Sequence, residues 1–266
     1  MRIFVHLSYK GTSYRGWQRQ AASIPLTVQQ IVEEALVIML KYDCYISGCG
    51  RTDAGVHAST FYFSLDLKKS LDFDFCERLN RVLPNDIVAI KQYEVEDSQN
   101  TRFDAYERIY NYYFHLNSNP FDAEISTFID CKLDIDIMIA AAAILSKMKD
   151  FKFLCKQPEK HRTTTCSINY IRFYTNKART HYRVEISADR FLRGMIRIMM
   201  SRLFMIGNGK ISLHEFELWI NGQFDTHSKP AYPQGLFLTD VKYEFLDSGI
   251  TVIQNMPNQK AWLPLK

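Results

Sequence analysis

The pattern of apolar and polar positions predicts one order of elements in the first part of the chain. Thr27 begins a helix, because Gln30 three residues later completes a capping box and the following residues keep one face apolar. Pro84 ends a second helix. The predicted elements are, in order, a strand at Arg2–Tyr9, a helix at Thr27–Leu40, strands at Cys44–Ser47 and Ser59–Leu67, a helix at Asp72–Leu83 and a strand at Asp86–Val95.

The same order recurs in the rest of the chain. The predicted elements there are a strand at Glu107–Leu116, a helix at Ile135–Met148, strands at Cys166–Tyr174 and Thr180–Ala188, helices at Arg190–Ile206 and Leu213–Asn221, and a strand at Leu236–Phe245. A repeated β-α-β-β-α-β order predicts an α+β protein of two tandem ferredoxin-like halves, with antiparallel sheets flanked by helices. We place the halves at residues 1–103 and 104–266, with the join near Thr101–Tyr106.

Composition and charge narrow the class of protein. The 266 residues are 47% hydrophobic and 23% charged, which excludes a disordered chain, a collagen-like chain and a disulfide scaffold. A net charge of +4 permits an RNA partner without requiring one. The six cysteines form no CxxC pair, so no structural metal is predicted. No apolar run approaches about 18 residues, which favours a cytoplasmic protein without a membrane segment.

The segment Gly48–Ala58 is the main candidate for chemistry. Its glycines allow turns that other residues resist, and the loop presents Asp53 two residues from Arg51. A nearby cation keeps a carboxylate ionised, and an ionised carboxylate can act as a nucleophile or a base. By spacing alone, a glycine-rich turn whose aspartate bonds its own backbone is the commoner explanation. We expect His57 to be a structural hydrogen-bonding residue rather than a catalyst or ligand.

The longer sequence of this loop, GRTDAGVHA at positions 50–58, resembles the signature of the tRNA pseudouridine synthase A family. The resemblance continues through other blocks from about residue 7 to residue 243. Those blocks are Tyr9–Tyr14, Gly16–Gln20, Leu79–Ile87, Arg102–Ala105, Arg108–Tyr112, Met195–Arg197 and Gly235–Leu238. The family's two ferredoxin-like halves enclose a central RNA-binding cleft, which agrees with the repeat predicted from the hydrophobic pattern.

The resemblance implies isomerisation of uridine to pseudouridine at positions 38, 39 and 40 in the anticodon stem-loop of tRNA. It implies no cofactor and no metal, because the reaction involves neither a redox change nor a group donor. It also implies a homodimer that holds tRNA across both subunits. Two alternatives stay open: a catalytically inactive RNA-binding module on the same scaffold, and a synthase acting on other RNA positions. A hydrolase with paired carboxylates is disfavoured, because the signature loop has no second acidic residue nearby.

The family also implies roles for individual residues. Asp53 matches the catalytic aspartate, as nucleophile or stabilising carboxylate, with its attack on C1′, attack on C6 and a glycal route left open. Arg197 is the expected ion-pair partner of Asp53, and Arg51 is the alternative. Arg51 is also expected to bind the substrate, because a neighbouring residue of the loop is well placed for phosphate. Tyr110 matches the tyrosine that packs on the target base and helps remove the C5 proton. Leu236 or Leu238 is expected to close the apolar side of the uracil pocket.

Other residues are interpreted from their pattern on the predicted elements. Tyr106 and Tyr112 share a strand face with Tyr110 and are expected to be core aromatics. RNA contacts are expected where basic and aromatic residues alternate along the chain. The candidates are Lys10, Tyr14, Arg15, Trp17, Gln18, Arg19, Arg190 and Arg193, with a further basic stretch at Lys152, Lys156, Lys160, His161 and Arg162.

Overall fold

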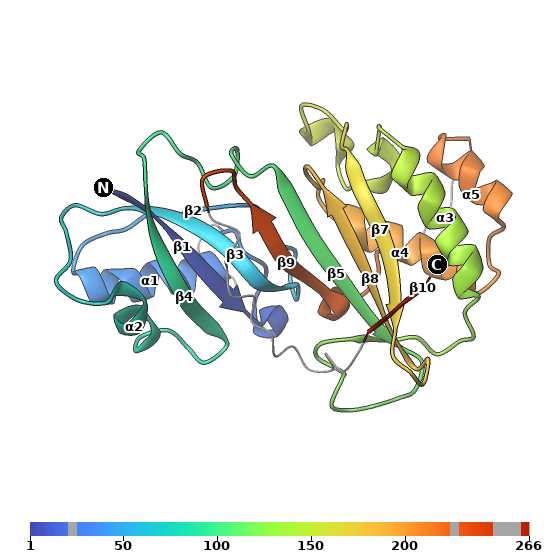
Figure 1. Cartoon of the computed structure of the whole chain (residues 1–266), viewed down its shortest axis with the longest axis horizontal. Coiled ribbons are helices and arrows are strands. Elements are labelled where there is room, and N and C mark those ends of the chain that lie inside the picture. Colours follow the sequence, from blue (N-terminus) through green and yellow to red (C-terminus); the bar gives the residue numbers. More distant parts are fainter. Residues whose placement is uncertain (21–25, 224–228, 247–261, 266) are drawn as a thin grey trace. The chain divides into compact units, whose positions relative to one another are not determined.

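A computed structural model describes residues 1–20, 26–223, 229–246 and 262–265, and within them the chain has a mixed α+β fold (Figure 1). The chain divides into two units. Unit 1 comprises Met1–Glu107 with Phe237–Gln254, and unit 2 comprises Arg108–Leu236 with Asn255–Lys266. The predicted α+β class is confirmed.

Unit 1 is a sheet with two helices. Its elements are β1 (Arg2–Tyr9), a 3₁₀ turn (Gly11–Ser13), α1 (Val28–Leu40), β2 (Ser47–Gly48), β3 (His57–Asp66), α2 (Phe75–Asn80), β4 (Ile87–Val95) and most of β9 (Leu236–Lys242). The strand order is β9-β3-β1-β4, with β2 paired to β3. β1 is antiparallel to β3 and β4, whereas β9 is parallel to β3.

The central strand of unit 1 is buried on both faces. Ile3, Val5 and Leu7 alternate with Phe4 and His6, and the side chains of all five are inaccessible to solvent. A strand covered on both sides needs apolar residues at consecutive positions. The burial of β1 therefore fixes the sheet from which the loops of unit 1 extend.

Unit 2 has a second sheet and three helices that pack together (Figure 1). Its elements are β5 (Glu107–His115), β6 (Thr127–Phe128), α3 (Ile135–Lys147), 3₁₀ turns at Lys152–Leu154, Pro158–Lys160 and Pro233–Gly235, β7 (Ile168–Thr175), β8 (His181–Ala188), α4 (Met195–Gly207), α5 (Leu213–Ile220) and β10 (Leu263–Leu265). The strand order is β10-β7-β8-β5, with β6 paired to β5.

The predicted elements β1, β3, β4, β5, β7, β8, α1, α3 and α5 are confirmed to within two residues. The capping box at α1 is confirmed only in part. The Thr27 side chain accepts a hydrogen bond from the Gln30 backbone, but the Gln30 side chain donates to Glu34 on the next turn instead of returning to Thr27. The short strands β6 and β10 have no counterpart in the sequence prediction, because two or three residues give too short a pattern to detect.

Four predicted elements are wrong in extent. The strand predicted at Cys44–Ser47 is reduced to Ser47–Gly48, because the Ile46 backbone donates to the Glu33 carboxylate instead of to a strand. The helix predicted at Asp72–Leu83 begins only after Asp74, whose side chain accepts the Glu77 backbone N–H and caps it. The closing strand ends at Lys242 rather than at Phe245.

The helix predicted at Arg190–Ile206 begins only at Met195. Gly194 precedes it with φ +69°, a left-handed conformation that glycine adopts readily and that cannot continue a right-handed helix. Arg190 and Arg193 therefore lie in the connection before α4 and not on a helix face. Tyr106 also departs from expectation: it precedes β5 and is 51% exposed, so it is not a core aromatic.

A buried carboxylate connects α1 to the chain on either side of it. Glu33 accepts hydrogen bonds from the Gln29 side chain (3.0 Å) and the Ile46 backbone (3.3 Å), and pairs with Arg19 at 2.6 Å. The Glu33 side chain is only 4% exposed, whereas that of Arg19 is 48% exposed. The network links Arg19, the start of α1 and the segment that enters β2.

We expect Glu33→Ala to lower the free energy of unfolding by about 2 kcal/mol, because the buried Ile46 N–H loses its acceptor. Glu34 is the matched control, since it is exposed on the same helix and bonds only to a neighbouring turn. Glu34→Ala should change stability by less than about 0.5 kcal/mol. Urea unfolding of both variants measures the difference, and equal losses would remove the structural role of the Glu33 network.

The burial of His6 makes stability depend on pH. Its ring stacks on Tyr62 at 5.2 Å, and desolvation lowers its pKa from 6.5 to about 4. As pH falls below 6.5, the unfolded chain binds a proton at His6 before the folded chain does, so the folded state loses stability until about pH 4. We expect His6 to account for a loss of about 2 kcal/mol between pH 7 and pH 4.5. Urea unfolding at both pH values should show a smaller loss for His6→Phe, and parallel losses would contradict the assignment.

Candidate active site

The loop between β2 and β3 carries Asp53 in a partly exposed position. Gly55 has φ +76°, and the Val56 backbone N–H donates to the Asp53 carbonyl at 3.2 Å, so the chain turns directly after the aspartate. The turn leads back into β3 at His57. The loop therefore presents a single carboxylate at the end of a buried strand.

A second loop, residues 10–17, lies against both sides of the Asp53 turn. The Trp17 N–H donates to the Thr52 carbonyl at 3.3 Å, and the Gly55 N–H donates to the Tyr14 carbonyl at 3.2 Å. Gly16 is required here, because its φ is +91° and a Cβ would lie 2.4 Å from the Thr52 oxygen. The backbone before and after Asp53 is thus held by one segment.

Side chains hold the same two loops together. The Tyr9 and Thr52 hydroxyls are 2.8 Å apart, and the Gly11 N–H donates to His57 Nδ1 at 3.0 Å. The structural role predicted for His57 is confirmed by this bond and by its stacking on Phe237. In the sequence, Tyr9 stands out only as part of the Tyr9–Tyr14 block. A single sequence does not reveal its contact with Thr52, which lies 43 positions further along the chain.

Asp86 fixes the other end of the 10–17 loop. Its carboxylate accepts the Tyr14 hydroxyl at 2.6 Å, and its carbonyl accepts the Lys10 N–H at 2.9 Å. Burial is the main cause that raises the pKa of the Tyr14 phenol above its ordinary value, and the Asp86 carboxylate raises it further. The Tyr14 hydroxyl therefore stays a hydrogen-bond donor. Asp86 lies in the Leu79–Ile87 block of the sequence, but nothing in that block indicates that it anchors the 10–17 loop.

Trp17 and Tyr14 form part of the core beneath the site. Trp17 is 1% exposed and lies 4.0 Å from the Phe61 ring, while Tyr14 is 6% exposed. The structure therefore gives these two residues a packing role. Their predicted contacts with RNA stay a prediction.

The other predicted contact residues of unit 1 are exposed. Lys10, Arg15, Gln18, Arg19 and Arg51 all lie on the surface of unit 1. Arg51 Nε donates to the Gln18 side chain at 3.0 Å, which fixes the guanidinium two residues from Asp53. Contacts of these five residues with RNA stay a prediction.

Tyr110 and Arg197 belong to unit 2. Tyr110 lies within β5 and meets the Phe191 ring edge-on at 5.1 Å. Arg197 lies in the first turn of α4, where Nε donates to the Ala231 carbonyl at 2.8 Å. The predicted pairing of Arg197 with Asp53 joins residues of different units and stays a prediction.

Three further predicted residues, Tyr112, Leu236 and Leu238, are buried. Tyr112 is inaccessible to solvent, and its hydroxyl bonds Thr127 and donates to the Tyr232 carbonyl, both at 2.9 Å. Burial raises the pKa of Tyr112, and its predicted core role is confirmed. Leu236 is buried in unit 2, as Leu238 is in unit 1, and the predicted uracil contact of either leucine stays untested.

Two basic segments of unit 2 form one surface. The Lys156 N–H donates to the Arg193 carbonyl at 2.9 Å, and Arg193 Nη1 donates to the Gln157 side chain at 2.8 Å. The Lys156 side chain also lies along Gly194, in the turn before α4. The basic stretch 152–162 and the connection carrying Arg190 and Arg193 are therefore contiguous. We call them the basic surface.

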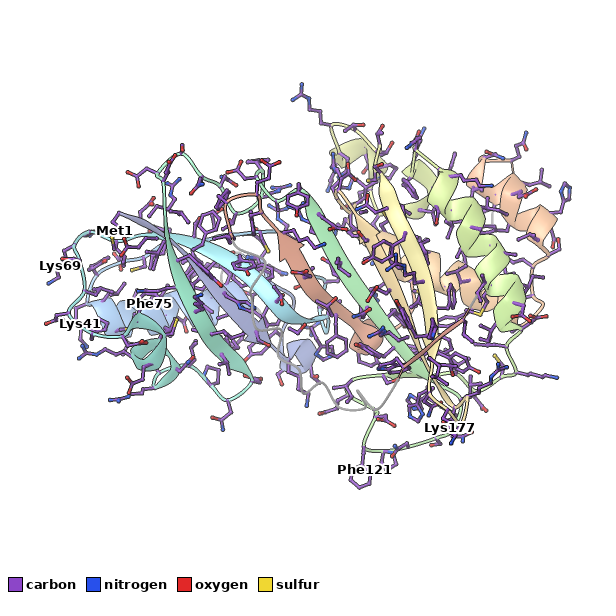
Figure 2. All side chains as sticks on the ribbon, in the orientation of Figure 1. Met1, Lys41, Lys69, Phe75, Phe121 and Lys177 are labelled. Carbon is purple, nitrogen blue, oxygen red and sulfur yellow. The ribbon has the colours of Figure 1, made fainter. Side chains whose placement is uncertain are left out.

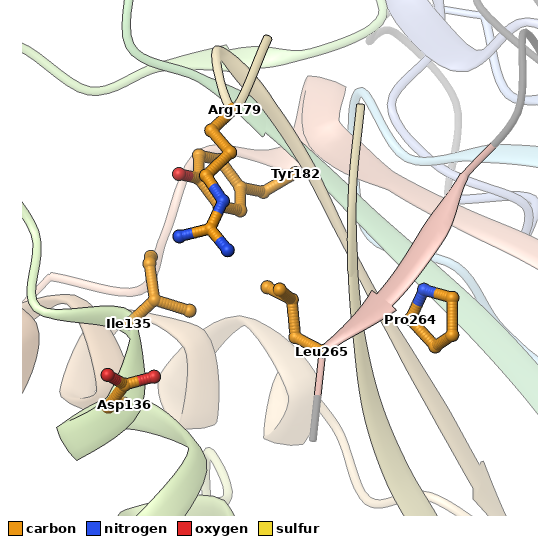
Figure 3. Close-up of a pocket in the computed structure, with 6 residues that line it drawn as sticks. All are labelled: Ile135, Asp136, Arg179, Tyr182, Pro264 and Leu265. Atoms are coloured by element: carbon orange, nitrogen blue, oxygen red, sulfur yellow. The ribbon is translucent and has the colours of Figure 1, made fainter. Parts of the chain in front are cut away.

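A cavity of about 280 Å³ lies elsewhere in unit 2 (Figure 3). It is lined by Ile135, Asp136, Arg179, Tyr182, Pro264 and Leu265, none of which is a predicted site residue. Among the described residues, no group of histidine, cysteine and acidic side chains is arranged to hold a metal ion. None of the helices in the described ranges is both long and apolar enough to span a membrane.

The chain is similar to known proteins over nearly its whole length. A family model described as tRNA pseudouridine synthase matches residues 141–244. The tRNA pseudouridine synthase A of Azobacteroides pseudotrichonymphae is 37% identical over 244 residues, covering 91% of this chain and 96% of the relative. Those of Porphyromonas gingivalis and Bacteroides fragilis are each 36% identical, covering 91% of this chain and 97% and 96% of the relatives. The chain therefore belongs to the tRNA pseudouridine synthase A family, a family of isomerases.

Proposed function

We propose that this protein isomerises uridine to pseudouridine at positions 38, 39 and 40 of the tRNA anticodon stem-loop, with Asp53 as the catalytic nucleophile. The observation that carries the proposal is the fixed presentation of Asp53: hydrogen bonds hold the backbone at Thr52 and Gly55, while the aspartate itself is partly exposed. Family membership supplies tRNA uridine as the substrate.

The reaction is balanced within the substrate. The bond from uracil N1 to C1′ breaks, the ring turns, and C5 bonds to C1′, while C5 loses a proton and N1 gains one. An ionised Asp53 stabilises this exchange by bonding covalently to the substrate, at C1′ or at C6, or by taking a proton on a glycal route. In every case the carboxylate must be held at the reacting atoms, which the two-loop arrangement supports.

Arg197 and Tyr110 complete the proposed machinery. We propose Arg197 as the ion-pair partner of Asp53, the role that the family resemblance implies for it. Tyr110 stacks on the target uracil and assists removal of the C5 proton. Moving a uridine out of a helical stem costs a few kcal/mol of free energy. Stacking of the uracil on an aromatic ring recovers about 1–3 kcal/mol of that free energy.

RNA binding is proposed for exposed cations of both units. In unit 1 these are Lys10, Arg15, Arg19 and Arg51, together with Gln18. In unit 2 they belong to the basic surface, where only Glu159 opposes the cations between positions 152 and 162. Phosphate contacts from such residues orient RNA without selecting its sequence.

The finer architecture is also a proposal. The order β4-β1-β3-β2 in unit 1, with two helices between its strands, supports a ferredoxin-like half, and we extend it to a tandem pair. Leu236 or Leu238 would cover the apolar side of the uracil. We further propose that the protein is cytoplasmic and works as a homodimer.

Asp53→Ala should abolish release of tritium from tRNA transcripts that contain 5-tritiated uridine, because isomerisation must expel the C5 hydrogen. We expect a loss of more than about 1,000-fold relative to the wild type, as for other covalent catalytic groups. Filter binding of the same tRNA is the control and should stay within about threefold. Tritium release by the variant at the wild-type rate would exclude Asp53 as the catalytic carboxylate, and release by neither protein would favour an RNA-binding module.

Lys160→Gln and Arg193→Gln should each reduce the salt dependence of tRNA binding, since each removes one phosphate contact. The slope of log K against log salt should fall by about one unit per cation, with kcat unchanged. Lys41→Gln and Lys69→Gln are matched controls, because both lysines project into solvent from unit 1 (Figure 2). Equal slopes for all four variants would exclude the basic surface as an RNA contact.

A further inference from the structure

We propose that the hydroxyls of Tyr9 and Tyr14 are positioning groups that hold Asp53 in its reactive geometry, with Asp86 as the anchor of Tyr14. The proposal rests on the catalytic role proposed for Asp53. It assigns a positioning role to three residues that lie outside the loop carrying Asp53. We call Tyr9, Tyr14 and Asp86 the tyrosine clamp.

The Tyr14 arm of the clamp acts on the chain after Asp53. Its carbonyl accepts the N–H of Gly55, two residues beyond the aspartate, at 3.2 Å. Its hydroxyl donates to the Asp86 carboxylate at 2.6 Å, a short distance typical of a charge-assisted bond. Because one residue makes both contacts, the position of Gly55 depends on that of Asp86.

The Tyr9 arm acts on the chain before Asp53. Its hydroxyl lies 2.8 Å from the Thr52 hydroxyl, and Tyr9 itself is 3% exposed at the end of β1. The Thr52 carbonyl accepts the Trp17 N–H on the same side of the loop. Thr52 is therefore held through both its side chain and its backbone.

Apolar packing alone would not hold the Asp53 carboxylate in one fixed position. Trp17 and Phe61 bury the base of the loop, but dispersion contacts allow small sliding movements that a directional hydrogen bond resists. The Tyr9 hydroxyl contacts Thr52 directly, whereas the Tyr14 hydroxyl anchors to Asp86 the residue whose carbonyl holds Gly55. One contact therefore lies on each side of Asp53. A misplacement of about 1 Å in a catalytic group can cost about 100-fold in rate, so loss of one hydroxyl should affect the chemical step.

The test is single-turnover tritium release with enzyme in excess over tRNA. Tyr14→Phe and Tyr9→Phe should each lower the rate constant about tenfold while the Kd for tRNA stays within twofold, since only the transition state loses stabilisation. Tyr42→Phe is the matched control: its hydroxyl accepts the Lys68 N–H at 3.4 Å, away from the two loops, and it should keep the wild-type rate.

Variants of Asp86 separate positioning from general stability. Asp86→Asn keeps an acceptor for Tyr14 and should retain at least half of the wild-type rate, whereas Asp86→Ala should match Tyr14→Phe. The double variant Tyr14→Phe with Asp86→Ala should be no slower than either single variant, because both remove the same bond. Hydrogen exchange at the Gly55 amide should quicken in Tyr14→Phe and not in Tyr42→Phe.

The outcomes distinguish this proposal from the proposed function. Tritium release by the wild type, together with full rates for Tyr14→Phe and Tyr9→Phe, would overturn the clamp alone. Rates that fall only in proportion to the folded fraction would also overturn it. No release by the wild type would overturn the catalytic role of Asp53 and the clamp with it.

Discussion

The close approach of the 10–17 loop to the backbone around Asp53 is the constraint on which the candidate site depends. Gly16 permits it, because any larger residue would collide with the Thr52 carbonyl. Once the two loops are this close, the Trp17 ring can contact the Phe61 ring. The N–H groups of Trp17 and Gly55 can then donate to the carbonyls of Thr52 and Tyr14 on the opposite loop. Backbone pairing and aromatic burial thus reinforce one another.

The sequence predicted the fold well where the hydrophobic pattern is long and uninterrupted. β1 was predicted at its observed ends because every one of its central residues is buried. The start of α4 was missed because helical periodicity continues through Arg190 and Arg193, and only the left-handed backbone at Gly194 ends it. The strand predicted at Cys44–Ser47 was wrong in extent, because the buried carboxylate of Glu33 accepts the Ile46 backbone N–H.

The candidate site was predicted in part. The loop carrying Asp53 stands out by its motif, but the residues that hold it do not. Tyr14 and Trp17 illustrate the difficulty, since an aromatic residue beside arginines has the same pattern whether it stacks on RNA or fills a core. Tyr9 and Asp86 act over long separations along the chain, and only the folded structure brings them to the loop.

The shared backbone contacts of the two loops limit how this chain can be changed. The Thr52 carbonyl accepts the Trp17 N–H and leaves no room for a side chain at Gly16. The Gly55 N–H donates to the Tyr14 carbonyl. Neither loop can change its length or backbone path without a matching change in the other, although they are separated by α1 and β2 in sequence. Residues 9–17 and 48–57 are therefore structurally coupled. A chimera between this chain and a relative must exchange both segments together.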